Sequence, residues 1–318
     1  MKSILIIIEE VGAYNYIEPV IEKLLSHEVH IYLYINHKLK ISTTSTFKLR
    51  KVFKFLLFHE INELNLNKFS CLVVSATGKK IENEIVTKAI KFNVRSIQFV
   101  DNIYGWKRRL SYKKKTVFPK YLAVINNQCK ILAQKEGIPC KIIKVVGHPA
   151  WEKIHSNFAR KNTNTLFIGS PINEIYKNKL GYTEKEVWDM CIKIHKHYPN
   201  LIKNIKYLLH PMQKNPPYIS NNYLIKRITK NNKFYGQVIG IYSSLLTEAY
   251  LQGKKVISIQ PKNKEDNWIL SRLYNEHYIH SYKNLITGLT KKTQNSKKLF
   301  YEMKNSKIRL YNLINDSV

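Results

Sequence analysis

The sequence predicts an α/β protein with two doubly wound domains, and three observations support this fold class. Short runs of β-branched apolar residues recur along the chain, each followed by a polar turn and a helix-length segment with apolar residues three or four positions apart. This alternation is typical of a parallel sheet with crossover helices. The 318 residues suffice for about two domains. A hydrophobic content of 44% excludes a mainly disordered polycation.

The first half provides a series of buried strands. Ile4–Ile8 opens the series, and Tyr16–Leu25 fits the helix that follows, with Pro19 acceptable because it would fall in the first turn. Further strands are expected at Val29–Ile35, Cys71–Ser75, Ser96–Val100, Tyr121–Ile125 and Ile142–Val146. Together they predict a first doubly wound domain.

The second half repeats the alternation after a polar linker. Trp151–Phe158 is typical of a helix, and the polar run Arg160–Asn164 follows it, so we expect domains at 1–158 and 159–318. Strands are expected at Thr165–Ile168, Ile205–Leu209, Gln237–Ile241 and Lys255–Ile259, helices at Glu184–His197, Ser244–Gln252 and Trp268–Tyr274, and a closing amphipathic helix at Lys297–Ile314. Two Rossmann-like domains facing a central cleft are the simplest architecture, with ligands bound outside the carboxyl ends of the strands.

The charge is large but spread along the chain. The 53 Lys and Arg residues exceed the 22 Asp and Glu residues, which gives a formal net charge of +31. The two halves carry +14 and +17, so no dedicated basic arm is present. Only 8 of the cations are Arg, and 30 Asn accompany them, which indicates compositional bias. We therefore expect no nucleic-acid partner, because such binders gather their charge on one face or arm.

Three turns of the second half lie at expected strand ends and are candidates for binding a phosphate. Ser243 or Ser244 would cap the helix after one strand, whose free amides attract an anion, and Glu248 lies one turn further on. His210, aimed by Pro211, could donate to a phosphate or act near a leaving group. Gly169 and Ser170 form a turn that allows close backbone approach. An ordinary helix cap and a structural histidine are the alternatives.

The first half offers carboxylates for general-base chemistry. Asp101 follows a strand directly and is the preferred base for deprotonating an acceptor hydroxyl, with a simple turn cap as the alternative. Glu9 and Glu10, after the first strand, are rival bases, and Gly12 could keep their loop open. The turn Ser75–Gly78 is either an acceptor-side loop or a helix start. His148, before Pro149, is expected at a hinge or cleft wall.

Two basic and aromatic segments could meet an anionic membrane or a polyanionic glycan. Phe47–Phe58 would form an amphipathic helix with cations at its margins, and Trp106–Lys115 is the densest charge cluster. The cations concerned are Lys48, Arg50, Lys51, Lys54, Arg108 and Arg109. A solvated surface beside a packed helix is the alternative.

Targeting and metal signals are absent from the sequence. No apolar run approaches the roughly 20 residues that a spanning helix needs, and the short run Ile4–Ile8 meets Glu9 at once. The histidines show no metal-ligand spacing, and the scattered cysteines are typical of reduced core thiols. We expect a cytoplasmic protein without a metal, with peripheral attachment to the cytoplasmic face of the inner membrane as an alternative.

The motifs of the second half resemble those of bacterial glycosyltransferases with the GT-B architecture, especially sialyltransferase and polysialyltransferase-like enzymes of surface-polysaccharide biosynthesis. Those enzymes hold the CMP moiety of their donor with a His-Pro motif and a later Ser-Ser or Ser-Thr motif, which His210-Pro211 and Ser243-Ser244 match. Val238–Pro261 and the segment from Phe99 to Pro149 resemble uncharacterised polysaccharide-biosynthesis proteins of surface-glycan gene clusters, so the likeness as a whole covers about two thirds of the chain. The family's acidic pair followed by Gly is replaced here by Asp101-Asn102.

The resemblance implies a metal-independent glycosyltransferase. It would move a sugar, such as sialic acid or a related nonulosonic acid, from a nucleotide-activated donor, with a CMP-sugar favoured, to a cell-surface glycan or glycolipid of the capsule or lipopolysaccharide type. No separate cofactor is implied. A UDP-sugar 2-epimerase-like enzyme and a non-catalytic basic glycan-binding protein are the alternatives, and teichoic-acid polymerases that use CDP-alcohols share the layout. The oligomeric state stays open.

Overall fold

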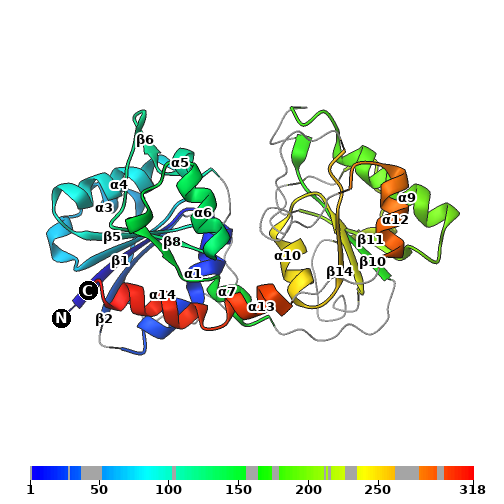
Figure 1. Ribbon diagram of the computed structural model, residues 1–318. Coiled ribbons are helices and arrows are strands. Elements are labelled where there is room, and N and C mark those ends of the chain that lie inside the picture. The colour runs from blue at the N-terminus through cyan, green and yellow to red at the C-terminus, as the bar shows by residue number, and fades with distance from the viewer. Residues whose placement is uncertain are drawn as a thin grey trace. The chain divides into compact units, whose positions relative to one another are not determined.

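The computed structural model describes residues 2–27, 29–36, 52–101, 105–154, 164–173, 179–210, 213, 216–225, 235–261, 279–291 and 297–318. Contacts divide the chain into two compact units. Unit 1 comprises Met1–Lys153 and Tyr301–Val318, and unit 2 comprises Ile154–Phe300. Each unit is a parallel sheet with helices packed against it (Figure 1).

Unit 1 is built on a seven-stranded parallel sheet with the order β3-β2-β1-β4-β5-β8-β9. Its strands are β3 (Lys54–Leu56), β2 (Val29–Ile35), β1 (Lys2–Ile8), β4 (Cys71–Ser75), β5 (Arg95–Phe99), β8 (Tyr121–Val124) and β9 (Ile143–Val145). In the centre, Ile6 pairs with Leu33 on one side and Val73 on the other. The continuous apolar run of β1 forms a central strand because both faces of the sheet are covered.

Helices cover the two faces of this sheet, and alternate residues of β1 pack against them. Ile4, Ile6 and Ile8 pack with α1 (Val11–Leu24) and α14 (Ser306–Asn315), whereas Leu5 and Ile7 pack with α3 (Phe58–Glu63) and α4 (Lys80–Lys91). All five side chains are fully buried. Each such burial contributes about 1.5–3 kcal/mol, so the run from residue 4 to residue 8 anchors unit 1.

Shorter elements fill the remainder of unit 1. They are η2 (Leu66–Lys68), α5 (Trp106–Arg109), the antiparallel hairpin β6 (Ser111–Tyr112) and β7 (Lys115–Thr116), α6 (Asn127–Lys135), η3 (Cys140–Ile142) and α7 (Pro149–Glu152). Asn126 caps α6, since its Oδ1 accepts a hydrogen bond from the Cys129 amide at 2.9 Å.

Unit 2 is built on a five-stranded parallel sheet with the order β12-β11-β10-β13-β14. The strands are β12 (Leu224–Ile225), β11 (Lys203–Leu208), β10 (Asn164–Ile168), β13 (Gln237–Gly240) and β14 (Lys255–Ser258). Helices α9 (Glu184–His197) and α12 (Tyr282–Thr290) share one core with the sheet, in which Trp188 contacts the rings of Phe167 and Tyr207. Helix α10 (Ser244–Leu251) contacts β13 and β14.

The C-terminal segment packs on unit 1. The Glu152 carboxylate accepts hydrogen bonds from the Asn305 and Lys307 amides at 2.9 and 2.8 Å, and so satisfies the start of α14. The Arg309 guanidinium donates to the carbonyl oxygens of Val146 and Glu302. The sequence-based division placed residues 301–318 in the second domain. The contacts place them in unit 1 because the apolar face of α14 joins the core under β1.

Several expected elements differ in the structure. Helix α1 begins at Val11, so Pro19 lies inside it and not in its first turn, and its missing N–H leaves the Asn15 carbonyl without the usual helical bond. The helix expected at 151–158 is α7, which ends at Glu152, and residues 155–158 lie outside the described residues. The closing helix is divided into α13 (Lys297–Met303) and α14 because Asn305 adopts the left-handed conformation, with φ of 63°.

The prediction of an amphipathic helix at 47–58 is wrong for residues 52–58, which are the part of this segment that the structure describes. Lys54–Leu56 is strand β3, which pairs in parallel with Tyr32–Tyr34, and α3 begins only at Phe58. Alternating aromatic and apolar residues pair readily at a sheet edge, where Phe53 also stacks on His30 at 4.1 Å. The helix expected at 268–274 lies outside the described residues. Of the four cysteines expected in the core, Cys71, Cys129 and Cys191 are buried and Cys140 is exposed.

The predicted fold class is confirmed, since both units are α/β with parallel sheets in doubly wound order. The central cleft between them stays a prediction. Among the described residues, no helix has both the length and the apolar character needed to cross a membrane.

Candidate functional site

The strand order of each sheet shows where a ligand site is expected. In unit 2 the chain runs outward from β10 through β11 to β12, and in the other direction from β13 to β14. The order therefore reverses between β10 and β13. In unit 1 it reverses between β1 and β4. Doubly wound proteins bind ligands at the carboxyl ends of the strands beside such a reversal. The candidate residues from the sequence lie at these edges.

In unit 2, the three candidate turns follow adjacent strands. Ile168 at the end of β10 pairs with Leu208 of β11 and with Gly240 of β13, so Gly169, His210 and Ser243 follow neighbouring strand ends. The Gly169 amide also donates to the Leu208 carbonyl at 2.9 Å. The structure thus brings the three turns to one edge of one sheet, as the sequence predicted. Pro211 lies outside the described residues.

The start of α10 carries the serine pair. Ser243 is the N-cap, and its Oγ accepts from the Leu245 amide at 3.3 Å, whereas Ser244 is the exposed first residue of the helix. No acidic residue lies in the first turn of α10. Glu248 is half-buried further along, and burial raises the pKa of its carboxyl. The positive end of the α10 dipole at the sheet edge is an arrangement that stabilises an anion.

The turn after β10 has an internal role. A Cβ on residue 169 would lie 2.5 Å from Gln213 Oε1 and 2.8 Å from the Leu208 carbonyl oxygen, so only glycine fits. The Ser170 amide donates to the buried Glu184 carboxylate, and is therefore not free for a ligand. The binding role predicted for Gly169 and Ser170 stays a prediction, and the protein itself provides a reason for the glycine.

In unit 1, carboxylates gather where β1 and β5 end. Glu10 is 47% exposed, and its pKa is raised by burial and then by the charge of Asp101, while Lys79 and Arg109 oppose the rise. Asp101 is half-buried, and burial raises its pKa against the attraction of Arg109. A Cβ on Gly12 would lie 2.4 Å from Asp101 Oδ2, so the glycine gives this carboxylate room beside the start of α1. Raised pKa values suit carboxylates that act as bases near neutral pH.

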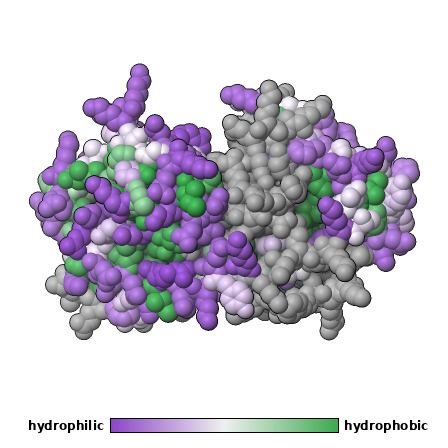
Figure 2. Space-filling model, viewed as in Figure 1, coloured by the Kyte–Doolittle hydropathy of each residue, from purple (hydrophilic) through white to green (hydrophobic). Residues whose placement is uncertain are grey.

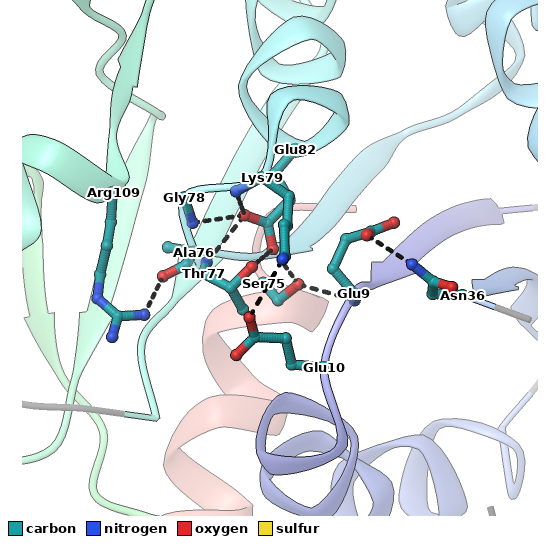
Figure 3. Close-up of polar contacts among 10 residues, drawn as sticks. All are labelled: Glu9, Glu10, Asn36, Ser75, Ala76, Thr77, Gly78, Lys79, Glu82 and Arg109. Atoms are coloured by element: carbon teal, nitrogen blue, oxygen red, sulfur yellow. Dashed lines mark hydrogen bonds and ion pairs between the residues drawn. The ribbon is translucent and has the colours of Figure 1, made fainter. Parts of the chain in front are cut away.

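The structure separates the two rival glutamates (Figure 3). Glu9 is buried and accepts a hydrogen bond from Asn36 at 2.9 Å and one from Tyr34. Burial, and then Glu9, raise the pKa of Tyr34 to about 12. Glu10 instead faces the Lys79 amine at 3.8 Å. Glu9 is thus held by the fold, and Glu10 is the more accessible of the two.

Arg109 belongs to this carboxylate cluster and not to an anionic-surface patch, which corrects the sequence-based assignment. Its side chain is only 8% exposed, and Nη1 donates to the Ala76 carbonyl oxygen at 3.0 Å (Figure 3). Its positive charge opposes the rise in the pKa values of Glu10 and Asp101. Because Arg109 is buried and hydrogen-bonded to a backbone carbonyl, it is withdrawn from an exposed surface patch.

The turn Ser75–Gly78 is a helix start. Glu82 is fully buried, and its Oε2 accepts from the amides of Thr77, Gly78 and Lys79 at 2.8, 2.9 and 3.0 Å (Figure 3). Burial raises the pKa of Glu82 to about 7, and the hydrogen bonds oppose the rise. These amides are occupied by the protein's own carboxylate, so the N-terminus of α4 offers no free anion site.

His148 packs inside unit 1. Its ring stacks on Trp151 at 3.9 Å and meets Tyr16 edge-on at 4.7 Å, and burial lowers its pKa to about 3. It is therefore neutral, and its described contacts are those of a core histidine. The predicted role as hinge or cleft wall stays a prediction.

The other basic residues are mostly exposed. Lys54 pairs with Glu60 at 2.6 Å, and Arg108 is exposed on α5. Lys48, Arg50 and Lys51 lie outside the described residues. In the β6–β7 hairpin, both turn residues, Lys113 and Lys114, have positive φ, and Figure 2 shows a hydrophilic projection at the place where Figure 1 draws this hairpin.

Sequence reasoning missed the buried partners Glu82, Arg109, Glu184 and Gln213. Glu82 stands three residues after the N-cap, but the cap is Lys79 and not the Ser or Thr of a capping box, so that pattern does not mark it. Glu184 begins a predicted helix, where an acidic residue is ordinary, so no signal marked it. Within the described residues, no group of three or more His, Cys, Asp and Glu side chains is placed to hold a metal ion.

Comparison with known proteins supports the architecture. No protein-family model matches the chain, and no curated protein sequence matches it. Among solved structures, UDP-GlcNAc 2-epimerase from Neisseria meningitidis bound to UDP-GlcNAc is 13% identical, with a TM-score of 0.63 over 98% of this chain and 100% of the other. UGT89C1 from Arabidopsis thaliana complexed with UDP is 10% identical, with a TM-score of 0.62 over 100% of both chains.

A third solved structure gives the same result. MurG from Acinetobacter baumannii is 11% identical, with a TM-score of 0.55 over 99% of this chain and 100% of the other. At these identities the likeness concerns the fold alone. The chain has the GT-B type of fold, with two Rossmann-like domains, which confirms the predicted fold class.

Proposed function

We propose that this protein is a GT-B glycosyltransferase that moves a sugar from a nucleotide-activated donor to a glycan acceptor. The observation that carries the proposal is the edge of the unit 2 sheet, where the turns of Gly169, His210 and Ser243 follow adjacent strands and the α10 N-terminus has no acidic residue in its first turn. Such an edge suits the phosphates of a nucleotide. UDP-GlcNAc, UDP and thymidine diphosphate are bound by proteins of similar fold.

The donor half of the reaction is assigned to unit 2. The amides at the start of α10, the hydroxyls of Ser243 and Ser244, and His210 would stabilise the charge that develops on the phosphate as the bond to the sugar breaks. Glu248, on the same helix, would accept from a ribose hydroxyl. This chemistry needs no metal ion in principle, because fixed dipoles and a histidine can neutralise a leaving group.

The acceptor half is assigned to unit 1. Asp101 would remove the proton from the acceptor hydroxyl, and Arg109 would keep the carboxylate ionised at working pH, since it opposes the rise in the Asp101 pKa. Glu10 is the rival base, because it is more exposed and its pKa is also raised. Glu9, held by Asn36, would support the loop.

The finer assignment is a CMP-sugar donor, with sialic acid or a related nonulosonic acid as the sugar, and a capsule or lipopolysaccharide-type acceptor. It depends on the resemblance of His210 and Ser243-Ser244 to the motifs of CMP-using enzymes. A thermal-shift screen against CMP, CDP, UDP and GDP tests it, because a ligand that binds only the folded state raises the melting temperature. We expect CMP to give the largest shift. A larger shift with UDP would overturn the CMP assignment, and no shift with any nucleotide would overturn the transferase proposal.

Variants locate the nucleotide. His210→Ala and the double variant Ser243→Ala/Ser244→Ala are expected to weaken binding of the nucleotide selected by the screen, whereas Asp189→Asn, an exposed change on α9, should leave it unchanged. Unchanged binding in the first two variants would place the nucleotide elsewhere.

A UDP-sugar 2-epimerase is the second candidate, favoured by the similar folds of several such enzymes. An epimerase acts on the donor alone, whereas a transferase releases nucleotide in an acceptor-dependent reaction. Incubation with UDP-GlcNAc and no acceptor, followed by NMR of the sugar nucleotide, separates the two. Appearance of an epimer would support the second candidate.

Attachment to an anionic surface is a further part of the proposal. The hairpin tip places Lys113 and Lys114 in the left-handed conformation, which costs about 1–2 kcal/mol for each non-glycine residue. The change Lys113→Asn/Lys114→Gly suits this turn and removes two charges, so we expect a more stable protein that sediments less with phosphatidylserine vesicles. Equal sedimentation of both proteins would remove the hairpin from the surface proposal.

A further inference from the structure

A buried carboxylate and a buried amide lie directly behind the phosphate-side turns of unit 2. Glu184 is the first residue of α9 and is 2% exposed, and Gln213 is 9% exposed. The Gln213 side-chain amide donates to Glu184 Oε2. The two residues are 29 positions apart in the sequence and form one polar pair under the sheet edge.

Each member of the pair contacts a different turn. Glu184 Oε1 accepts from the Ser170 amide, in the turn after β10. Gln213 Oε1 accepts from the backbone amide of His210 at 3.1 Å, in the turn after β11, and the backbone amide of Gln213 donates to the His210 carbonyl at 2.9 Å. The chain of hydrogen bonds therefore runs from one turn to the other through two side chains.

Two tyrosines complete the pair. The Tyr218 hydroxyl donates to Glu184 Oε2 at 3.1 Å, and the Tyr207 hydroxyl donates to Gln213 Oε1 at 3.3 Å. Gly169 has no side chain, and this leaves room for Gln213 Oε1, which would lie only 2.5 Å from a Cβ at position 169. All these donors are matched by acceptors, which is what a buried polar network requires.

We propose that Glu184 and Gln213 are positioning residues that fix the Gly169–Ser170 turn and the His210 turn relative to each other, so that unit 2 binds the phosphate of a nucleotide. This inference rests on the proposed function of unit 2. Neither side chain is expected to touch the nucleotide. They act through the backbone of Ser170 and His210, whose amides point inward to them.

The direction of the hydrogen bonds explains why the pair consists of one carboxylate and one amide. Glu184 accepts from every described partner and donates to none, so the network needs its ionised form. Burial raises the pKa of Glu184 to about 7, which shows that ionising this group opposes folding. Apolar side chains at this place would avoid the cost of burying a charge. The buried carboxylate therefore suits a role in holding the turns.

A reciprocal exchange tests the proposal. In Glu184→Gln, the new side-chain amide faces the amide of Gln213, and in Gln213→Glu two carboxylates face each other. In the double variant Glu184→Gln/Gln213→Glu, one amide again donates to one carboxylate, and the amides of Ser170 and His210 again find acceptors. We expect each single variant to weaken nucleotide binding by about tenfold, the effect of losing a hydrogen bond to a charged group, and the double variant to recover most of it.

The measurement is isothermal titration calorimetry with CMP and UDP, and with cytidine and uridine as phosphate-free controls. A positioning role predicts that the single variants lose affinity for the nucleotides and lose much less for the nucleosides. The full-length Asp189→Asn variant removes an exposed carboxylate from the same helix and should bind as the wild type does. Tyr218→Phe, which removes one donor, is a milder variant that keeps the carboxylate and serves if a single exchange fails to fold.

The outcomes distinguish this inference from the proposed function. If the wild type binds none of CMP, CDP, UDP and GDP, the proposed function fails. If the wild type binds and both Glu184→Gln and Tyr218→Phe bind equally well, the positioning role is overturned. It is also overturned if nucleosides and nucleotides lose affinity alike, or if the double variant recovers nothing while its melting temperature stays within about 4 °C of the wild type.

Discussion

The edges of the two sheets differ in charge, although both units have the same doubly wound order. Beside the reversal in unit 1, Glu10 follows β1 and Asp101 follows β5, and the buried Arg109 opposes the rise in the pKa of both carboxyls. At the reversal in unit 2, they carry His210 and Ser243, and no acidic residue stands in the first turn of the adjoining helix. The first edge suits removal of a proton, and the second suits a bound anion. One fold thus offers two chemistries through the residues that follow its strands.

In each unit, a buried glutamate accepts hydrogen bonds from a turn at a strand end. The two glutamates differ in the number of turn amides that they occupy. Glu82 accepts three consecutive turn amides and so occupies the start of α4. Among the described residues, Glu184 accepts from one backbone amide, that of Ser170, and from the side chains of Gln213 and Tyr218. Helix α10 begins on a different turn, capped by Ser243. In unit 1 the protein's own carboxylate occupies the anion site. In unit 2 the first turn of α10 carries no acidic residue, and its N-cap is the neutral Ser243.

The largest expected effect concerns the carboxylates of unit 1. Asp101→Asn removes the proposed base and should lower the transfer rate by about 10²–10⁴, without changing nucleotide affinity, which we assign to unit 2. Acceptor-dependent nucleotide release and calorimetry measure the two quantities. Because burial raises the pKa of Asp101, the wild-type rate should fall with decreasing pH from above the usual carboxyl range.

The matched control for this prediction is Glu10→Gln, the same exchange on the neighbouring carboxylate. It should lower the rate much less than Asp101→Asn does. The reverse order of effects would make Glu10 the base and would contradict the assignment of Asp101.

The next effect concerns the buried glutamate of unit 1. Burial raises the pKa of Glu82 to about 7 in the folded protein, against 4.5 for an unperturbed carboxyl. The folded state holds this proton more tightly, so its contribution to stability is fully present below pH 4.5 and is lost as the pH rises to about 7. The difference amounts to about 3 kcal/mol. Glu82→Gln should therefore lose less free energy of unfolding between pH 5 and pH 8, measured by urea denaturation.

Glu84→Gln on the same helix is the control, since its carboxylate is 29% exposed and bonds to Tyr112 outside the turn. If the free energy of unfolding depends on pH in the same way in the wild type and in Glu82→Gln, Glu82 does not titrate as stated.

The two glycines at the edges should respond differently to an added methyl group. Gly169→Ala brings a Cβ against the Leu208 carbonyl, which is backbone, and should destabilise unit 2 by about 1–3 kcal/mol. Gly12→Ala meets only the Asp101 carboxylate, which can rotate away, so the loss of stability should be smaller and the loss of transfer rate larger. Calorimetric melting and the transfer assay measure both. An unchanged melting temperature for Gly169→Ala would contradict the packing described for this turn.

The smallest effect separates the two serines of unit 2. Ser243→Ala removes the N-cap bond to Leu245 and should cost about 1 kcal/mol in free energy of unfolding. Ser244→Ala changes an exposed residue and should cost less than about 0.5 kcal/mol. Equal values in urea denaturation would mean that the cap contributes nothing to α10.

Much of the architecture could be predicted from local patterns. The runs at residues 4–8 and 71–75 form strands because β-branched and other apolar residues buried on both faces suit a central parallel strand. The run at residues 29–35 forms the neighbouring strand β2, which is only partly buried. The helix expected at 47–58 was wrong in its described part because the same aromatic and apolar residues fit an edge strand, and only the neighbouring β2 decides between them. The start of α1 was also missed, since Pro19 is tolerated within that helix.

The sequence by itself determined which residues follow strands, and so placed Asp101, His210 and Ser243 at sheet edges, because strand ends are set by local periodicity. Only the tertiary structure decided which strands are neighbours, that Arg109 and Glu82 are buried, and that Gln213 meets Glu184 across 29 positions. Burial of a charged side chain depends on packing between distant segments, and residue type favours exposure. For this reason no local pattern could reveal the buried partners that hold both edges.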